Sequence, residues 1–218
     1  MARKLLIIPI FHTGAEMGTA REGLEKISER LVGIEVWNRH KKNLLEFWDL
    51  VEKLVLERTK DIDISKVKLY QDGQVINGAV GVKMVEEIAK RGSKNHQILL
   101  NLINRGAKLM RTESFELLKE EYRYIRGIVL GKSLREVLDA RIAYKKRKDL
   151  LLKERDKYIA KNISKSLGEN ELGILFIGAM HKVEQELPKD VEIEYLEDAR
   201  LKILMQEIMK VIAKTILI

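Results

Sequence analysis

The ten residues LGILFIGAMH, at positions 172–181, decide the fold that this sequence predicts. Their first six residues form a continuous apolar run, which is typical of a strand buried on both faces of a parallel sheet. Gly178 would permit a sharp exit from the strand, and the turn then ends at His181. The run VEIEY at 191–195 indicates the next strand. The segment therefore predicts two parallel strands joined by a short helix that ends at Pro188.

Three further strands are predicted upstream, at 5–11, 66–70 and 107–111. Helices separate the strands, and the hydropathy pattern predicts them most clearly at 34–58, at 133–166 with a break near Tyr144, and at 198–217. Strands that alternate with helices indicate an α/β fold, helix-rich, with a mostly parallel central sheet of about five strands. No repeat or linker interrupts the pattern, so residues 1–218 are expected to form a single α/β domain.

The composition narrows the class of protein. The chain has no cysteine, which excludes disulfides, iron–sulfur clusters and thiolate metal sites. The apolar run 5–11 contains Pro9 and is too short for a signal peptide or a membrane span, so we expect a cytoplasmic protein that does not enter the membrane. Abundant Lys, Glu, Arg and Ile, with few glutamines, resemble the composition of proteins from thermophiles.

Polar side chains follow four of the predicted strands. In chain order they are His12 and Glu16, then Gln71 and Asp72, then Thr112 and Glu113, and finally His181. Ligands of parallel sheets bind outside the carboxyl ends of the strands, so these groups would converge if the strands are neighbours. Imidazole and carboxylate groups together suit Zn²⁺, Mn²⁺ or Fe²⁺, with His12 and His181 as the candidate ligands. The same groups also suit general acid–base catalysis without a metal.

Each of these residues has an ordinary structural alternative, because loops that follow strands are commonly polar. His40 lies beside basic residues in a predicted helix, so a solvated position is expected, and His96 is placed in a polar loop. For His181, the predicted helix after Gly178 would bring free N–H groups close to the imidazole, where they could bind an anion or lower the histidine pKa.

A strongly basic segment spans residues 141–165, with ten lysines and arginines but only three acidic residues. Lys153, Lys157, Lys161 and Lys165 recur at every fourth position and would share one helix face. Such a face could contact phosphates, although a solvated surface is the simpler interpretation. The chain carries no nucleic-acid-binding motif and no P-loop, GxGxxG, HExxH or GxSxG motif.

Parts of the sequence resemble a known group of proteins. Glu154-Arg155-Asp156, then Ile159-Ala160, then GILFIGAMH at 173–181, resemble the TraB/PrgY, Tiki and ChaN-like group, in which a helix with an arginine and a polar residue precedes a strand that ends in GxxH. That group has a second GxxH turn after its first strand, where this chain keeps His12 but not the glycine. The middle of the chain, from KLYQDG at 68–73 to Glu121-Tyr122, is similar to a set of uncharacterised bacterial proteins.

The resemblance implies an α/β fold with His12 and His181 close together. It also implies metal-dependent hydrolysis in the Tiki branch and haem-iron binding in the ChaN branch. Arg155 and Asp156 match further positions of the group's pattern.

The leading functional hypothesis is a metal-assisted hydrolase. His12 and His181 would act as metal ligands or as acid–base groups, with Glu16, Asp72 and Glu113 completing the site. Arg155, Gln71 and Asp156 would then bind a small or anionic substrate.

Two alternatives belong to other classes. One is a non-catalytic module that binds an anionic ligand or nucleic acid through the basic helix 141–165. The other is a structural protein that forms a homodimer through its apolar C-terminal helix, although that helix is more simply explained by packing on its own sheet.

Overall fold

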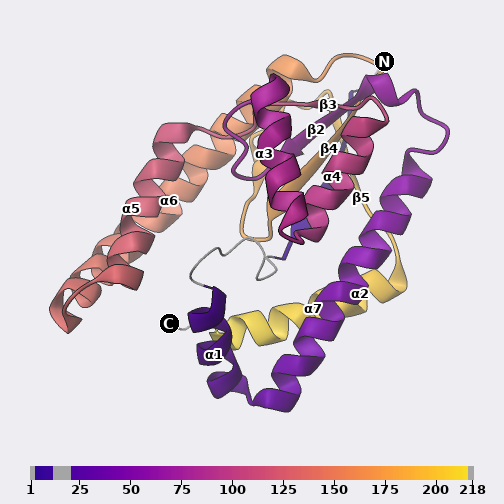
Figure 1. The fold of residues 1–218 in the computed structure, drawn as a ribbon. Coiled ribbons are helices and arrows are strands. Elements are labelled where there is room, and N and C mark those ends of the chain that lie inside the picture. Colours follow the sequence, from indigo (N-terminus) through magenta and orange to yellow (C-terminus); the bar gives the residue numbers. More distant parts are fainter. Residues whose placement is uncertain (1–2, 12–20, 216–218) are drawn as a thin grey trace.

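The structure is a computed structural model that describes residues 3–11 and 21–215 (Figure 1). Its five strands form one parallel sheet in the order β3-β2-β4-β1-β5, which confirms the predicted α/β class. The strands are β1 (Arg3–Ile10), β2 (Val67–Gln71), β3 (Lys108–Leu109), β4 (Leu172–Gly178) and β5 (Val191–Tyr195). Helical residues far outnumber strand residues, as the sequence predicts.

Helices cover both faces of the sheet. One face packs against α2 (Ile34–Arg58), α3 (Gly78–Lys90), α4 (Lys94–Asn104) and α7 (Ala199–Thr215). The other face packs against the second half of α6 (Leu134–Ser166). The remaining helices are α1 (Arg21–Val32), which lies against α2 and α7, and α5 (Phe115–Leu130), which pairs with α6. The C-terminal helix α7 thus contributes to the core, through Leu201, Leu204 and Ile208.

The position of β1 and β4 between two helix layers explains why each has an uninterrupted apolar run in its sequence. In β1, Leu6 and Ile8 point into the core beneath α2, whereas Leu5 and Ile7 point into the core beneath α6. β4 alternates in the same way, and residues 5–8 of β1 and 172–177 of β4 are all buried. A strand with a helix layer on each face needs apolar side chains at every position, which produces a continuous hydrophobic run.

The connection between β4 and β5 differs from its prediction. Both strands are parallel to β1, which lies between them, but no α-helix joins them. The connection contains a single 3-10 turn, η4 (Val183–Gln185), so the predicted short helix and its N-terminal anion site are wrong. Only residues 179–190 connect the end of β4 to the start of β5, and in this stretch the chain must pass β1. Pro188 also cannot continue a helix.

The long helix α6 is continuous from Leu134 to Ser166, so the predicted break near Tyr144 does not occur. α5 and residues 134–150 of α6 form a helical hairpin, here called the arm, which extends away from the sheet (Figure 1). The two helices approach closely, because a Cβ atom at Gly127 would lie 3.0 Å from the Cβ of Ala140. No residue of α5 is fully buried, so the arm is covered on one side only.

His40 is buried, with only 5% of its surface exposed, which contradicts the solvated position expected from its basic neighbours. Those neighbours are exposed to solvent, whereas the imidazole stacks on Trp37 with ring centroids 5.0 Å apart. Its Nδ1 atom has no hydrogen-bond partner within the described part of the chain. Burial lowers the pKa of His40 to about 4.

This burial predicts a pH-dependent loss of stability that depends on His40. Because the folded-state pKa lies below that of the unfolded chain, the stabilisation is present above pH 6.5 and is lost as the pH falls through about 4. We expect His40 to account for a loss of about 2 to 3 kcal/mol in unfolding free energy over that range. Urea unfolding of wild type and His40→Phe between these pH values will measure it. Parallel pH profiles for the two proteins would contradict the prediction.

Candidate functional site

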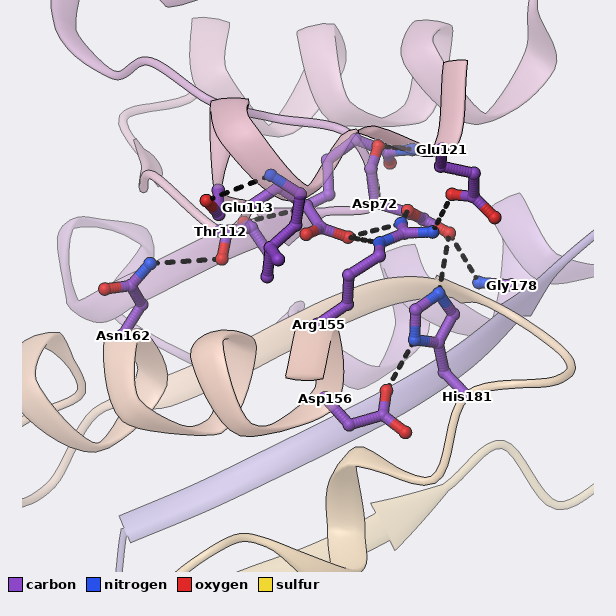
Figure 2. A network of polar contacts seen from close by, with 12 residues as sticks. Asp72, Thr112, Glu113, Glu121, Arg155, Asp156, Asn162, Gly178 and His181 are labelled. Carbon is purple, nitrogen blue, oxygen red and sulfur yellow. Dashed lines mark hydrogen bonds and ion pairs between the residues drawn. The ribbon is translucent and has the colours of Figure 1, made fainter. Parts of the chain in front are cut away.

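Three predicted site residues meet at the carboxyl edge of the sheet. Asp72 directly follows β2, Glu113 follows β3 and His181 follows β4, and these three strands are neighbours in the sheet. One side-chain ligand atom from each residue lies within 4.8 Å of the other two. The expected convergence of these three groups is therefore observed (Figure 2).

Asp156 of α6 orients the imidazole of His181. Oδ1 of Asp156 lies 2.5 Å from Nδ1 of His181, and Oδ2 accepts a 3.0 Å hydrogen bond from the backbone N–H of Lys182. With Asp156 ionised, a neutral His181 ring carries its proton on Nδ1. Its Nε2 then presents a lone pair toward Asp72, whose Oδ2 is 3.7 Å away (Figure 2).

Arg155 lies at the centre of the carboxylates. Its Nε and Nη2 donate to Oε1 of Glu113 at 3.1 and 2.5 Å, and Nη2 also donates to Oδ1 of Asp72 at 2.7 Å. On the other side, Nη1 donates to Oε2 of Glu121 at 2.6 Å. Burial alone would lower the pKa of Arg155, but the hydrogen bond and charge of Glu113, together with Asp72 and Glu121, raise it above its ordinary value. The guanidinium thus holds three carboxylates of the protein itself.

Glu113 is the most deeply buried member of the cluster, with no exposed surface. Arg155 binds its Oε1, whereas its Oε2 has no hydrogen-bond partner among the described residues. Burial raises the pKa of Glu113 to about 7, and the ion pair with Arg155 offsets that effect only in part. A buried carboxylate oxygen without a partner is costly, so this atom is suited to bind a ligand.

Gly178 contributes to the site, though not in the way that the sequence suggests. Its backbone N–H donates to Oδ2 of Asp72 at 3.0 Å. A Cβ atom at this position would lie only 3.1 Å from that same oxygen, so a side chain would crowd the carboxylate. Gly178 is not among the glycines with positive φ, whereas Gly73, beside Asp72, has φ of +79° and makes the turn after β2.

Gln71 connects the site to a buried polar group on α4. Its Oε1 accepts a hydrogen bond from Nδ2 of Asn95 at 2.9 Å, and its Nε2 donates to the backbone oxygen of Asp72. His96 belongs to the same group, because its Nδ1 lies 2.8 Å from Oγ of Ser93. The loop position predicted for His96 is therefore wrong: α4 begins at Lys94 and buries this histidine.

Three residues differ from the others in how the sequence predictions for them can be compared with the structure: His12, Glu16 and Glu121. His12 and Glu16 lie outside the described residues, so their proposed roles stay predictions. Glu121 had no definite role, yet it binds Arg155, and Tyr144 donates to its other oxygen at 2.8 Å. A usable signal did exist, since Arg155 and Asp156 share the buried side of α6 with Ile159. Charges on the buried side of an amphipathic helix indicate internal partners.

The basic helix has the lysine face that the sequence predicts, and an apolar face besides. Leu151, Ile159 and Ile163 are buried against the sheet. The four lysines at 153, 157, 161 and 165 are exposed. Other basic residues of the segment bind carboxylates, as Arg147 does with Glu120 and Glu154.

Comparisons with known proteins produced no match: no family model fits the chain, and no curated protein or solved structure is significantly similar to it. Functional conclusions therefore depend on the geometry of the site. Within the part of the chain that the structure describes, no helix combines the length and apolar character needed to cross a membrane.

Proposed function

We propose that the protein is a metal-assisted hydrolase whose divalent cation is bound by Asp72, Glu113 and His181. The observation that carries this proposal is the convergence of one imidazole and two carboxylates at the carboxyl edge of a parallel sheet, with ligand atoms within 4.8 Å of one another. This is the edge at which α/β proteins bind their ligands. The metal-dependent hydrolysis implied by the TraB, Tiki and ChaN-like resemblance stays a prediction.

The donor set suits Zn²⁺, Mn²⁺ or Fe²⁺. Ligand atoms about 2.0 to 2.2 Å from a metal are about 3 to 4 Å from one another, so the observed cluster would need only a small contraction to coordinate an ion. The three ligands come from the segments that follow three neighbouring strands, so the strand order of the sheet brings these segments together.

Neighbouring groups support each proposed ligand. Asp156 accepts from Nδ1 of His181, which is the usual outer partner of a metal-binding histidine. The amide of Gly178 positions Oδ2 of Asp72. Arg155 binds one oxygen of each of these two ligands, Oδ1 of Asp72 and Oε1 of Glu113. It therefore orients both carboxylates, while Oε2 of Glu113 keeps its lone pairs available.

The charge of the cluster also favours a cation. Four carboxylates, those of Asp72, Glu113, Glu121 and Asp156, contact one arginine and one histidine. Side-chain exposure in the cluster does not exceed 22%, so water screens these charges weakly. A divalent ion would offset the excess negative charge that burial makes unfavourable.

A bound divalent ion would polarise a substrate carbonyl or phosphoryl oxygen and make a bound water more acidic. Of the protein groups, His181 is held in one orientation by Asp156. Arg155 stabilises the ionised carboxylates, since it contacts three of them. The network therefore supplies the fixed geometry and low solvent exposure that hydrolysis at such a site requires.

A second candidate function is general acid–base catalysis without a metal. It is favoured by the 2.5 Å contact between His181 and Asp156, which fixes the imidazole as in catalytic acid–base pairs. Glu113, whose pKa burial raises to about 7, would exchange a proton close to neutral pH.

Metal uptake by the chelator-treated protein tests the first proposal. After dialysis against Zn²⁺ or Mn²⁺, elemental analysis is expected to find about one ion per chain in the wild type and well under half an ion in Asp72→Asn. Glu120→Gln is the matched control, because Glu120 lies beside Glu121 but binds Arg147 outside the cluster, and this variant should keep its metal.

Hydrolysis of p-nitrophenyl acetate and p-nitrophenyl phosphate provides the functional readout. Turnover that a chelator abolishes and the added ion restores would support the metal-assisted hydrolase. A wild type that takes up neither ion would contradict it. Chelator-insensitive turnover that is lost in His181→Ala would instead support metal-free acid–base catalysis.

A further inference from the structure

One side of α6 in the arm is occupied by α5. Tyr144 donates to Glu121, and Arg147 bonds to Glu120. Ala140 packs against the backbone of Gly127. The residues of α6 that contact α5 thus recur at 140, 144 and 147, one turn apart, and define a single helix face.

The opposite side of the same helix carries exposed apolar residues. Ile142 lies two positions from both Ala140 and Tyr144, which rotates it by about 200° away from α5. Ile142 is 54% exposed and Leu138 is 47% exposed. Their charged neighbours Arg135 and Asp139 are also open to solvent, with side-chain exposures of 93% and 71%.

We propose that this side of α6 binds the same side of α6 in a second copy of the chain, with the two helices antiparallel and the two Ile142 side chains at the two-fold axis. Ile142 is the midpoint of residues 134–150, the part of α6 that belongs to the arm. Each arm would therefore lie along the whole length of the other, as far as the sheet of its partner (Figure 1). Such an interface uses the same surface patch on both subunits.

The charges along α6 favour an antiparallel pair of arms over a parallel pair. The first part of the arm helix contains the acids Glu136 and Asp139, whereas residues 145–148 are all basic. An antiparallel pair centred on Ile142 places Asp139 beside Lys146 of the partner subunit. Arg135 similarly lies level with Asp149 of the partner subunit. A parallel pair would instead place Lys145 and Lys146 of the two copies side by side.

The size of this contact predicts a weak dimer. Seventeen residues of helix span about 25 Å, and one helix pair of that length buries less than the roughly 1,200 Å² of a standard interface. The dissociation constant is therefore expected in the micromolar range or above. A dimer of this kind forms at high protein concentration and dissociates on dilution.

Sedimentation velocity from about 5 to about 500 µM, in low salt, measures this equilibrium. The wild type is expected to change from monomer to dimer across this range, and Ile142→Glu is expected to weaken the association at least about tenfold, since it places two like charges at the axis. Val80→Glu is the matched control. It replaces a 57% exposed apolar residue of α3, which is not part of the arm, and should dimerise like the wild type.

Charge reversal tests the antiparallel arrangement itself. Asp139→Lys and Lys146→Asp should each weaken the dimer, and the double variant should restore it, because each reversed charge then meets its opposite on the partner. Circular dichroism verifies that each variant is folded. A wild type that stays monomeric at about 500 µM overturns the proposal. Association that is insensitive to Ile142→Glu, or single defects that the double variant does not repair, also overturns it.

Discussion

Replacing Arg155 with methionine is expected to lower the free energy of unfolding at pH 7 by about 3 to 5 kcal/mol. The guanidinium binds Glu113, Asp72 and Glu121, and only 7% of the arginine side chain is exposed. Its removal leaves the fully buried Glu113 without its charged partner. A buried carboxyl group that loses its partner must bind a proton or stay charged in a low-dielectric interior, and both are unfavourable.

A second arginine of the same helix provides the control for this measurement. Arg147 also binds two carboxylates, those of Glu120 and Glu154, but the three side chains are 24% to 38% exposed. Arg147→Met is therefore expected to destabilise the protein much less than Arg155→Met, because water screens exposed ion pairs. Adding Glu113→Gln to Arg155→Met should recover part of the lost stability, since an amide at position 113 does not need a charged partner. Equal losses for the two arginine variants in urea unfolding would contradict this account.

The second large effect is expected on metal affinity. His181→Ala removes a proposed ligand and should weaken Zn²⁺ or Mn²⁺ binding by more than about 100-fold, measured by isothermal titration calorimetry. Asp156→Asn keeps the ligand but removes the carboxylate that accepts from Nδ1, so a smaller loss of about 10- to 100-fold is expected. The informative result is whether His181→Ala weakens metal binding more than Asp156→Asn does. An Asp156→Asn variant that binds metal like the wild type would show that Asp156 does not orient a metal ligand.

Much of the candidate site follows from a simple rule applied to the sequence. Asp72, Glu113 and His181 each follow a predicted strand, and parallel strands deliver such residues to one edge of a sheet. Whether they meet depends on strand order, which local patterns do not encode. The order β3-β2-β4 places the three ends side by side, and a different order would have separated them.

Arg155 and Asp156 show the limit of that rule. The sequence assigned both to substrate binding, yet their partners lie between 25 and 83 residues away in the chain and are set by how α6 docks on the sheet. His40 and His96 show the same limit, because each has polar neighbours in sequence and a buried environment in the fold.

The sequence by itself determined the α/β class, the two central strands and the two faces of α6, because local hydropathy periodicity reports directly on which sides of an element are buried. Only the tertiary structure decided that Arg155 binds three carboxylates, that Asp156 orients His181 and that a single 3-10 turn joins β4 to β5. The physical reason is that burial, pKa and ion pairing depend on contacts between segments distant in the chain, and those contacts follow from sheet order and helix docking.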